Sequence, residues 1–317
     1  MRANDWNDPG WRAGAEDWIK SRLADLGTPV TGSIEEFRVR PWSVTLRAPT
    51  AAGTRWFKAN TTDCRYEAAL ASALTRIAPG ATLPPLAVDT ERGWMLTADA
   101  GPTLRSTLNA DSRLDTWVEV LQAYARLQRA TQPHVAALLA LGVPDQRVPL
   151  LPGHLAGLLA DPQVRAQLDP AVPALGPSFS SWCAELAADG IPAALQHDDL
   201  HDNNVFPGLR FFDWGDASIA HPFGSLLVAL NVMHDALDPA DRPVALPRLR
   251  DAYLEPWSDL ASPSTLRRSA TLACRVTRVS RAMSWQRSLR DAAVPVSDSF
   301  RAAPAAWLNE LPTATTV

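Results

Sequence analysis

The arrangement of apolar residues changes near residue 100, and this change limits the folds that the chain can adopt. Before it, short runs of strand-forming residues alternate with turn residues, which is typical of a small antiparallel sheet. After it, apolar residues recur at helical spacing in most segments, with one strand-like stretch at 193–214. We therefore predict an α+β protein of two lobes, with a small N-terminal lobe over residues 1–100 and a larger, mainly helical lobe over residues 101–317.

The same periodicity gives approximate bounds for the elements. It predicts five strands in the first lobe, at 30–40, 43–48, 54–59, 86–88 and 94–97. It predicts helices at 11–26, 63–77, 116–130, 134–141, 153–168, 179–188, 224–236, 246–254, 264–289 and 298–310.

Composition excludes several classes of protein. The net charge is −4 at pH 7, whereas a protein that holds a nucleic-acid backbone is usually basic. No run approaches the roughly 18 apolar residues of a membrane span, and the first residues lack the apolar segment of a secretion signal. Cys64, Cys183 and Cys274 lie far apart, which is typical of buried thiols in a reducing compartment. We expect a cytoplasmic protein with no nucleic-acid and no membrane partner.

The densest polar run of the sequence lies in the helical half, between two apolar strand-like segments. It reads Gln196-His197-Asp198-Asp199-Leu200-His201-Asp202-Asn203-Asn204 and holds two His, three Asp and two Asn. Loops that carry so many acids on apolar supports are usually functional sites. We refer to residues 196–204 as the polar loop.

A hairpin is predicted to follow the polar loop, with its turn centred on Gly208 and Leu209. Pairing about that centre places Asn204 opposite Asp213, with Cβ atoms about 5 Å apart. An amide oxygen and a carboxylate so placed can share Mg²⁺ or Mn²⁺, which prefer oxygen ligands. Asp199 lies on the loop that feeds the hairpin, beside this metal site, and suits a general base for a hydroxyl group.

An alternative interpretation places a hydrolytic metal on His197 and His201, four residues apart, as in metal-dependent phosphohydrolases. Such a pair needs a helix beneath it. The segments Leu195-Gln196 and Asn203-Asn204 on either side of the pair do not favour a helix. This alternative is the less favoured of the two.

Lysine is rare in this chain. Of 30 basic residues, only Lys20 and Lys58 are lysines. Lys58 lies in the apolar strand-like run Arg55-Trp56-Phe57-Lys58-Ala59, where a compact ammonium can do what a planar guanidinium cannot. A strand-end lysine that reaches out to water would account for the same position. Both interpretations stay open from the residues alone.

The polar residues follow a known pattern. His197-x-Asp199-x-His201-x-x-Asn204, followed by a short hairpin and the run Phe212–Asp216, resembles the aminoglycoside phosphotransferase and choline kinase-like branch of the protein-kinase-like fold. That family usually shows H-G-D-x-H-x-x-N and then D-[FW]-x-D/E. The resemblance of layout covers roughly residues 30–235 and implies a two-lobed kinase-like fold.

The resemblance also implies a nucleotide site in the first lobe. Lys58 corresponds to the lysine that holds the nucleotide phosphates, and Glu67 corresponds to its ion-pair partner. The segment from Trp94 to Asp99, with Thr97, resembles the hinge strand whose backbone meets the adenine. Ser43, at the end of the preceding turn, is a candidate donor to a phosphate. The donor implied is ATP or GTP.

In the second lobe, the resemblance implies the catalytic and metal residues. Asn204 and Asp213 would hold the Mg²⁺ or Mn²⁺ that bridges the phosphates. Asp199 would orient the acceptor hydroxyl and take its proton, while His197 braces the loop. His201 has a similar role and is a candidate for substrate contact.

Some residues depart from the family pattern. Asp198 stands where glycine is usual, and Ser225 stands where an aspartate commonly supports the catalytic loop. The turn at 40–43 lacks the glycines of a phosphate cradle. Asp216 either assists the loop or a second metal, or simply caps a helix. These departures favour, as a second hypothesis, a nucleotide-binding pseudokinase or regulatory module.

The charge of the predicted helix at 264–289 gives an indication of the class of acceptor. Seven arginines and no acid lie between residues 261 and 290, so this helix has a cationic face. One interpretation is that the helix packs on the core and its charged face is solvated. The other is that the face lines the acceptor cleft, where it would repel a polycation. The sequence therefore predicts a small-molecule O-phosphotransferase whose acceptor is a sugar or related metabolite rather than a classical aminoglycoside.

Overall fold

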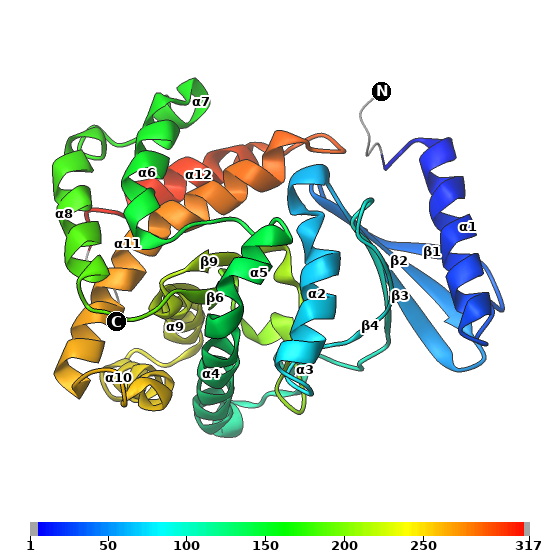
Figure 1. Cartoon of the computed structure of the whole chain (residues 1–317), viewed down its shortest axis with the longest axis horizontal. Helices are drawn as coiled ribbons and strands as arrows, with labels where there is room; N and C mark the ends of the chain where they lie inside the picture. Colours follow the sequence, from blue (N-terminus) through cyan, green and yellow to red (C-terminus); the bar gives the residue numbers. More distant parts are fainter. Residues whose placement is uncertain (1–5, 314–317) are drawn as a thin grey trace. The chain divides into compact units, whose positions relative to one another are not determined.

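The computed structural model describes residues 6–313, except the side chains of residues 110 and 111, and the chain forms two compact units (Figure 1). The first unit comprises Met1–Gly101, Asp213–Gly215 and Gln286–Arg301. The second unit comprises Pro102–Phe212, Asp216–Trp285 and Ala302–Val317. Residues 1–5, where the sequence shows no secretion signal, lie outside the described range. Two short segments distant in sequence thus join the first unit.

The first unit is built on a five-stranded antiparallel sheet in the order β1-β2-β3-β5-β4. The strands are β1 (Glu35–Val39), β2 (Ser43–Thr50), β3 (Gly53–Asn60), β4 (Pro85–Asp89) and β5 (Trp94–Ala98). All five predicted strands are confirmed. The first is shorter than predicted, because Val30 makes only an isolated bridge to Thr50 before the continuous pairing of β1 begins.

Helices α1 (Pro9–Asp25) and α2 (Tyr66–Ile77) lie on opposite sides of this sheet (Figure 1). The Asp8 side chain accepts the Trp11 backbone N–H and caps α1. Ile19 and Leu23 of α1 pack in one apolar core with Phe57 of β3. Because side chains alternate along a strand, Lys58 projects from the other face of β3. The core on one face therefore sets the direction of the lysine.

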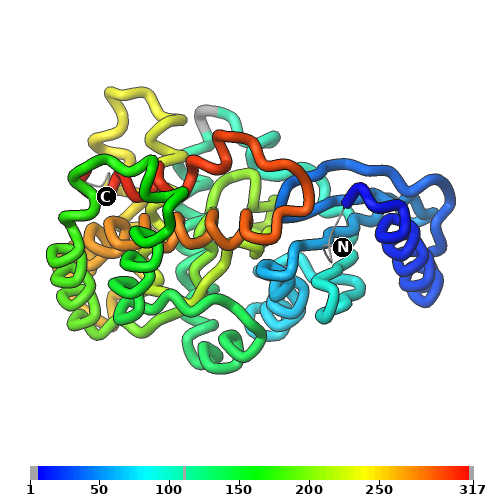
Figure 2. The backbone as a smooth tube through the Cα atoms, turned by 90° about the horizontal axis from the view of Figure 1, so that it is seen from above, coloured from blue at the N-terminus to red at the C-terminus, as the bar shows by residue number. Residues whose placement is uncertain are grey.

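The second unit is mainly helical, and every helix predicted there is confirmed. Its helices are α3 (Leu104–Thr107), α4 (Ala110–Thr131), α5 (Val135–Ala140), α6 (Leu151–Ala160), α7 (Pro162–Arg165), α8 (Gly176–Ala187), α9 (Leu226–Ala236), α10 (Arg242–Leu254), α11 (Pro263–Arg290) and α12 (Asp298–Asn309), the last two of which extend into segments of the first unit. The predicted helix at 153–168 is divided, because Asp161 caps a new helix that begins at Pro162. Figure 2 shows α11 and α12 side by side, and Arg278 of α11 donates to the Glu310 carbonyl just after α12. Across residues 6–313, no helix has both the length and the apolar composition of a membrane span.

Two small antiparallel ladders flank the polar loop. Strand β6 (Ala194–Gln196) pairs with β9 (Ser218–Ala220), and β7 (Val205–Phe206) pairs with β8 (Arg210–Phe211). The predicted hairpin is confirmed, but its predicted register is wrong by one residue. Val205 pairs with Phe211, so Asn204 faces Phe212 and not Asp213.

The turn geometry explains the error in register. The loop holds three residues, and both Gly208 (φ 78°) and Leu209 (φ 58°) adopt the left-handed conformation. The centre of pairing therefore falls on Gly208 and not between Gly208 and Leu209. Phe212 still donates its N–H to the Asn204 carbonyl at 3.2 Å, and Asp213 follows directly in the chain.

Candidate active site

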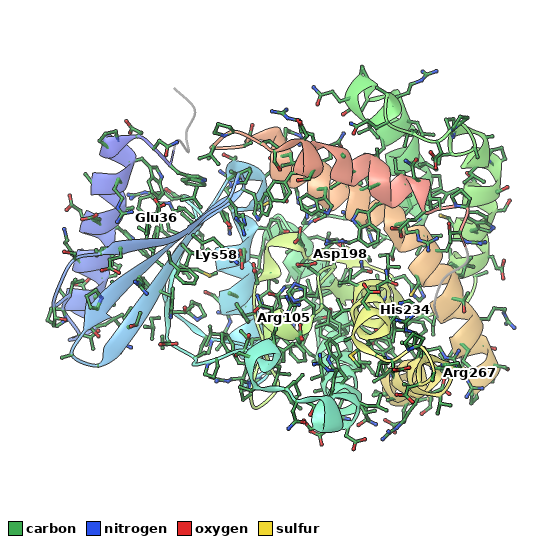
Figure 3. All side chains as sticks on the ribbon, turned by 180° about the vertical axis from the view of Figure 1, so that it is seen from behind. Glu36, Lys58, Arg105, Asp198, His234 and Arg267 are labelled. Atoms are coloured by element: carbon green, nitrogen blue, oxygen red, sulfur yellow. The ribbon has the colours of Figure 1, made fainter. Side chains whose placement is uncertain are left out.

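Lys58 is the centre of an ion cluster in the first unit. Its Nζ lies 2.7 Å from Glu67 Oε2 and 2.5 Å from Asp213 Oδ1. The Lys58 side chain is 15% exposed and that of Glu67 is fully buried. Figure 3 labels Lys58 on β3, next to α2. The structure thus brings three predicted site residues together, and the interpretation of Lys58 as a lysine that reaches out to water is wrong.

The charged groups in this cluster shift one another's pKa values. Burial alone would lower the pKa of Lys58, but the carboxylates of Asp213 and Glu67 together raise it above its ordinary range. Complete burial raises the pKa of Glu67, and the lysine only partly offsets this effect. The ammonium is therefore permanently charged and fixed in position.

Three further residues support the Lys58–Glu67 pair. Asn60 Nδ2 donates to Glu67 Oε2 at 2.6 Å, and Tyr66 donates its hydroxyl to the Gly215 carbonyl at 2.6 Å. A Cβ on Gly215 would lie 3.3 Å from Glu67 Oε2, so a larger residue there would crowd the carboxylate. None of these three residues was predicted to belong to the site. Asn60 could have been found, because it lies two positions after Lys58 and so on the same face of the strand.

Asp213 adopts a left-handed backbone conformation, with φ at 64°. Such a conformation costs about 1 kcal/mol or more for a residue other than glycine. It turns the chain at the end of the hairpin, and the Trp214 N–H then donates to Glu67 Oε1 at 3.0 Å. The turn thereby holds the Asp213 carboxylate against Lys58.

The remaining residues predicted for the nucleotide lie along the same sheet. Thr97 pairs with Trp56, which lies two positions before Lys58 and therefore on the same strand face. Asp99 is exposed just beyond β5 and accepts the Gly101 N–H. Ser43 is buried at the start of β2, opposite Asn60, so the preceding turn does not present it as an exposed donor.

Trp56 is a further residue that the sequence analysis did not single out for the site. Its ring packs edge-on against Phe37 with the centroids 4.8 Å apart, and it is only partly buried. This pair places a flat apolar surface on the sheet face that carries the lysine. Strand alternation from Lys58 was the signal that could have found it.

In the second unit, Asp199 is held by three side chains. Its Oδ1 lies 3.2 Å from Arg281 Nη2, and its Oδ2 lies 3.3 Å from His201 Nε2. Asn204 Nδ2 donates to the Asp199 carbonyl at 3.0 Å. Burial would raise the pKa of Asp199, but the Arg281 charge and the His201 contact hold it below its ordinary range. Asp199 is therefore an ionised, oriented carboxylate.

The two histidines of the polar loop face different partners. His197 Nε2 lies 2.8 Å from the Phe212 carbonyl, whereas His201 Nδ1 accepts the Asn203 N–H at 3.2 Å. The loop beneath them is not an α-helix. Within residues 6–313, no group of three or more His, Cys, Asp or Glu side chains is arranged to hold a metal ion. The geometry needed by a histidine-based hydrolytic metal site is thus missing from the described residues.

Asp198 explains how the polar loop dispenses with glycine. Its φ of 67° is in the left-handed region, which glycine adopts freely and aspartate tolerates better than most residues. The buried carboxylate accepts a hydrogen bond from Gln196 Nε2 at 2.6 Å. Asp198 therefore adopts a backbone conformation that is otherwise typical of glycine.

Arg281, on α11, is a site residue that the sequence analysis did not single out from its six neighbours. Its side chain is 6% exposed, and its guanidinium lies over the Trp307 ring at 5.5 Å and 3.9 Å from Asp216 Oδ2. The Ser284 hydroxyl, one turn later on α11, donates to Asp216. Arg281 therefore connects the carboxylates of Asp199 and Asp216.

Most other arginines of α11 are occupied elsewhere. They contact a carboxylate, a tryptophan ring or carbonyl groups at the end of α12, in the pairs Arg267–Asp251, Arg275–Trp182, Arg278–Glu310 and Arg290–Asp63. The predicted cationic face is therefore mainly structural. Arg281 is the member that reaches the polar loop.

Solved structures relate this arrangement to a known fold. A choline/ethanolamine kinase family protein from Mesorhizobium loti is similar with a TM-score of 0.61 and 16% identity, covering 94% of this chain and 95% of that one. A Plasmodium vivax ethanolamine kinase gives 0.59 and 11%, over 93% and 84%. The GDP and kanamycin complex of APH(2")-IIia gives 0.61 and 14%, over 93% and 98%. The protein has the two-lobed protein-kinase-like fold.

This kinase-like fold is the one that the sequence resemblance implied, and the α+β class is confirmed. No family model matches the sequence, and no curated protein matches it significantly. The likeness is thus one of architecture at low identity. Function is therefore inferred from the geometry of the site.

Proposed function

We propose that this protein is a small-molecule O-phosphotransferase that moves the γ-phosphate of ATP or GTP to a hydroxyl group of a small acceptor. The observation that carries the proposal is the ammonium of Lys58, fixed between Glu67 and Asp213. Phosphoryl transfer depends mainly on positioning and charge neutralisation, which a fixed ammonium can supply to nucleotide phosphates. The likeness to kinases and to a phosphotransferase solved with GDP and kanamycin supports the same class of reaction.

In this proposal, the nucleotide lies on the sheet face that carries Lys58. Lys58 contacts the phosphates, and Glu67 holds it in place. Trp56 offers a partly buried ring two residues away, suited to pack against a base. The edge of that base would lie at the end of β5, beside Thr97 and Asp99.

The residues present suit a divalent metal with oxygen ligands. The amide nitrogen of Asn204 is engaged by the Asp199 carbonyl, which leaves the amide oxygen for a cation, and Asp213 supplies a carboxylate. Mg²⁺ is commonly held by one or two protein oxygens together with phosphates and water. When bound, Mg²⁺ or Mn²⁺ would neutralise charge on the phosphates.

Asp199 would act as the base that orients the acceptor hydroxyl and takes its proton. Arg281 and His201 hold one oxygen each of its carboxylate, so its orientation is fixed before the acceptor binds. His197 ties the loop to the Phe212 carbonyl at the end of the hairpin. In this arrangement the histidines position the base and do not react.

We further propose that the acceptor is neutral or anionic. Asp199 and Asp216 share Arg281, and Asp202 pairs with Arg105 at 2.7 Å. Asp199, Asp202 and Asp216 thus have cationic partners, and the charge of these three carboxylates is offset and attracts a compound with several ammonium groups only weakly. A sugar or related metabolite suits this distribution of charge better than kanamycin does. The proposed enzyme is cytoplasmic, in keeping with three buried cysteine side chains.

The test is an assay of nucleoside diphosphate release with Mg²⁺ and either ATP or GTP. The acceptor panel holds sugars, polyols, ethanolamine, a macrolide and kanamycin, and product phosphorylation is checked by mass spectrometry. We expect release that a neutral or anionic hydroxyl compound stimulates. A nucleotide-induced rise in Tm without any turnover would instead support a binding module. Efficient phosphorylation of kanamycin, with kcat/KM of about 10⁴ M⁻¹s⁻¹ or above, would contradict the proposed acceptor class.

A further inference from the structure

A buried cluster of hydrogen bonds lies beneath the polar loop, entirely within the second unit. It consists of Tyr124 and Gln128 on α4, Ser225 just before α9, and Tyr253 on α10, and we call it the brace. Tyr124, Gln128 and Tyr253 are fully buried, and Ser225 is nearly so. Buried polar groups that satisfy one another fix a single local structure.

The brace holds the backbone where the polar loop begins. The His197 N–H donates to the Tyr124 hydroxyl at 2.7 Å. Gln128 Nε2 donates to the Leu195 carbonyl at 2.9 Å, and the Tyr124 oxygen lies 3.3 Å from Ser225 Oγ. Backbone groups on both sides of Gln196 are therefore fixed by side chains of α4.

This anchor lies very close to the proposed base. Only Asp198 separates His197 from Asp199, and its backbone is in the left-handed conformation. A shift of the His197 amide is therefore transmitted through two peptide units to the Asp199 carboxylate. The Asp199 carboxylate is held by Arg281 and His201. Its backbone is held separately, through the hydrogen bond from the His197 N–H to the Tyr124 hydroxyl.

We infer that Tyr124 is a positioning residue for Asp199, and that its hydroxyl supports the polar loop where residue 225 is only a serine. The inference rests on the proposed phosphotransferase function. The Ser225 hydroxyl touches the Tyr124 oxygen, and it is this phenol oxygen that accepts the His197 N–H. The serine at 225 is therefore compatible with an ordered active site.

The chemistry of the phenol suits this role. Burial raises the pKa of Tyr124 above its ordinary range, so the hydroxyl stays neutral. A neutral hydroxyl accepts the His197 N–H and at the same time donates to the Leu195 carbonyl at 3.4 Å or to Ser225. Phenylalanine at this position would keep the ring and remove both bonds.

The matched pair of variants is Tyr124→Phe and Tyr253→Phe. Both phenols are fully buried in the brace, but the Tyr253 hydroxyl contacts Gln128 Oε1 and the Pro222 carbonyl, which lie outside the polar loop, whereas Tyr124 bonds the His197 N–H. Both variants should lose similar amounts of Tm. Only Tyr124→Phe should lower kcat, by about 10- to 100-fold, because a displacement of about 1 Å can cost that much. The KM for the nucleotide should stay within about twofold in both.

One further measurement completes the test. Amide hydrogen exchange of residues 195–200 needs no turnover, and it should quicken in Tyr124→Phe and not in Tyr253→Phe.

Wild-type kcat in Tyr124→Phe, an equal kcat loss in Tyr253→Phe, or unchanged exchange would overturn the role of Tyr124. A wild-type protein without turnover would overturn the proposed function instead, and the exchange measurement would still decide whether Tyr124 holds the loop.

Discussion

Lys58 is the position at which two substitutions, Lys58→Met and Lys58→Arg, should separate the effect on stability from the effect on turnover. Its ammonium lies 2.7 Å from Glu67 and 2.5 Å from Asp213, and Glu67 is fully buried. Breaking a buried ion pair by removing one partner costs about 3–5 kcal/mol. We expect Lys58→Met to lower the free energy of unfolding by this amount. The expected fall in Tm is about 6–10 °C, at about 2 °C per kcal/mol for a chain of this size.

The loss should depend on pH in a defined direction. Burial raises the pKa of Glu67 above its ordinary value of 4.5, so the folded protein binds this proton more tightly than the unfolded chain does. Stability then falls as pH rises from 4.5 through the folded pKa. Without Lys58 the pKa of Glu67 rises further, and this window extends upward. The Tm difference between wild type and Lys58→Met should be larger at about pH 8 than at about pH 5.

Lys58→Arg separates the charge from the shape of the side chain. It keeps the positive charge, so its Tm should fall less than that of Lys58→Met. Its turnover should fail almost as completely, because a planar guanidinium on a longer side chain cannot take the place of the compact ammonium between Glu67 and Asp213. Thermal unfolding and nucleoside diphosphate release measure the two effects. Near-normal turnover of Lys58→Arg, or an unchanged Tm in Lys58→Met, would refute this reasoning.

Three other perturbations have defined outcomes. Asn204→Ala and Asp213→Ala should each weaken Mg-nucleotide binding in calorimetry, with a double variant little worse than either; additive losses would show that they share no ion. Arg281→Met removes the charge that lowers the pKa of Asp199, so the acid limb of kcat/KM should move to higher pH, and an unmoved limb would contradict that role. Asp189 lies 3.1 Å from His221 Nε2, which lowers the Asp189 pKa despite burial, so the stabilising effect of the carboxylate is lost as pH falls below 3.8. Asp189→Asn should therefore flatten the dependence of Tm on pH there, and an unchanged slope would contradict this pairing.

The fold was predictable because it depends on periodicity. Alternation over 54–59 and helical spacing over 264–289 each involve many residues, so single exceptions do not hide them. The hairpin register depended instead on two backbone angles, at Gly208 and Leu209, which no periodicity reveals. Strand β9, with three residues, is too short to show alternation and was missed.

Some residues of the site were likewise predictable from the sequence, and others were not. Lys58 stood out because lysine is rare in this chain, Asp213 was predicted from the hairpin, and Glu67 was implied by the family resemblance; the structure brings the three together. Arg281 lies 82 residues from Asp199, and Tyr124 lies 73 residues from His197. Tertiary packing decides which of the seven arginines of α11, and which tyrosine, contacts the polar loop. The local spacing of residues in the sequence does not predict these contacts.

The central claim is that Asp199 takes the proton of an acceptor hydroxyl. The direct measurement is acceptor-stimulated nucleoside diphosphate release by Asp199→Asn, together with the nucleotide affinity of the same variant. General bases contribute about 10²- to 10⁴-fold, so kcat should fall by at least about 100-fold while nucleotide affinity stays nearly unchanged. Retention of more than about a tenth of the wild-type kcat would contradict the assignment of Asp199 as the base.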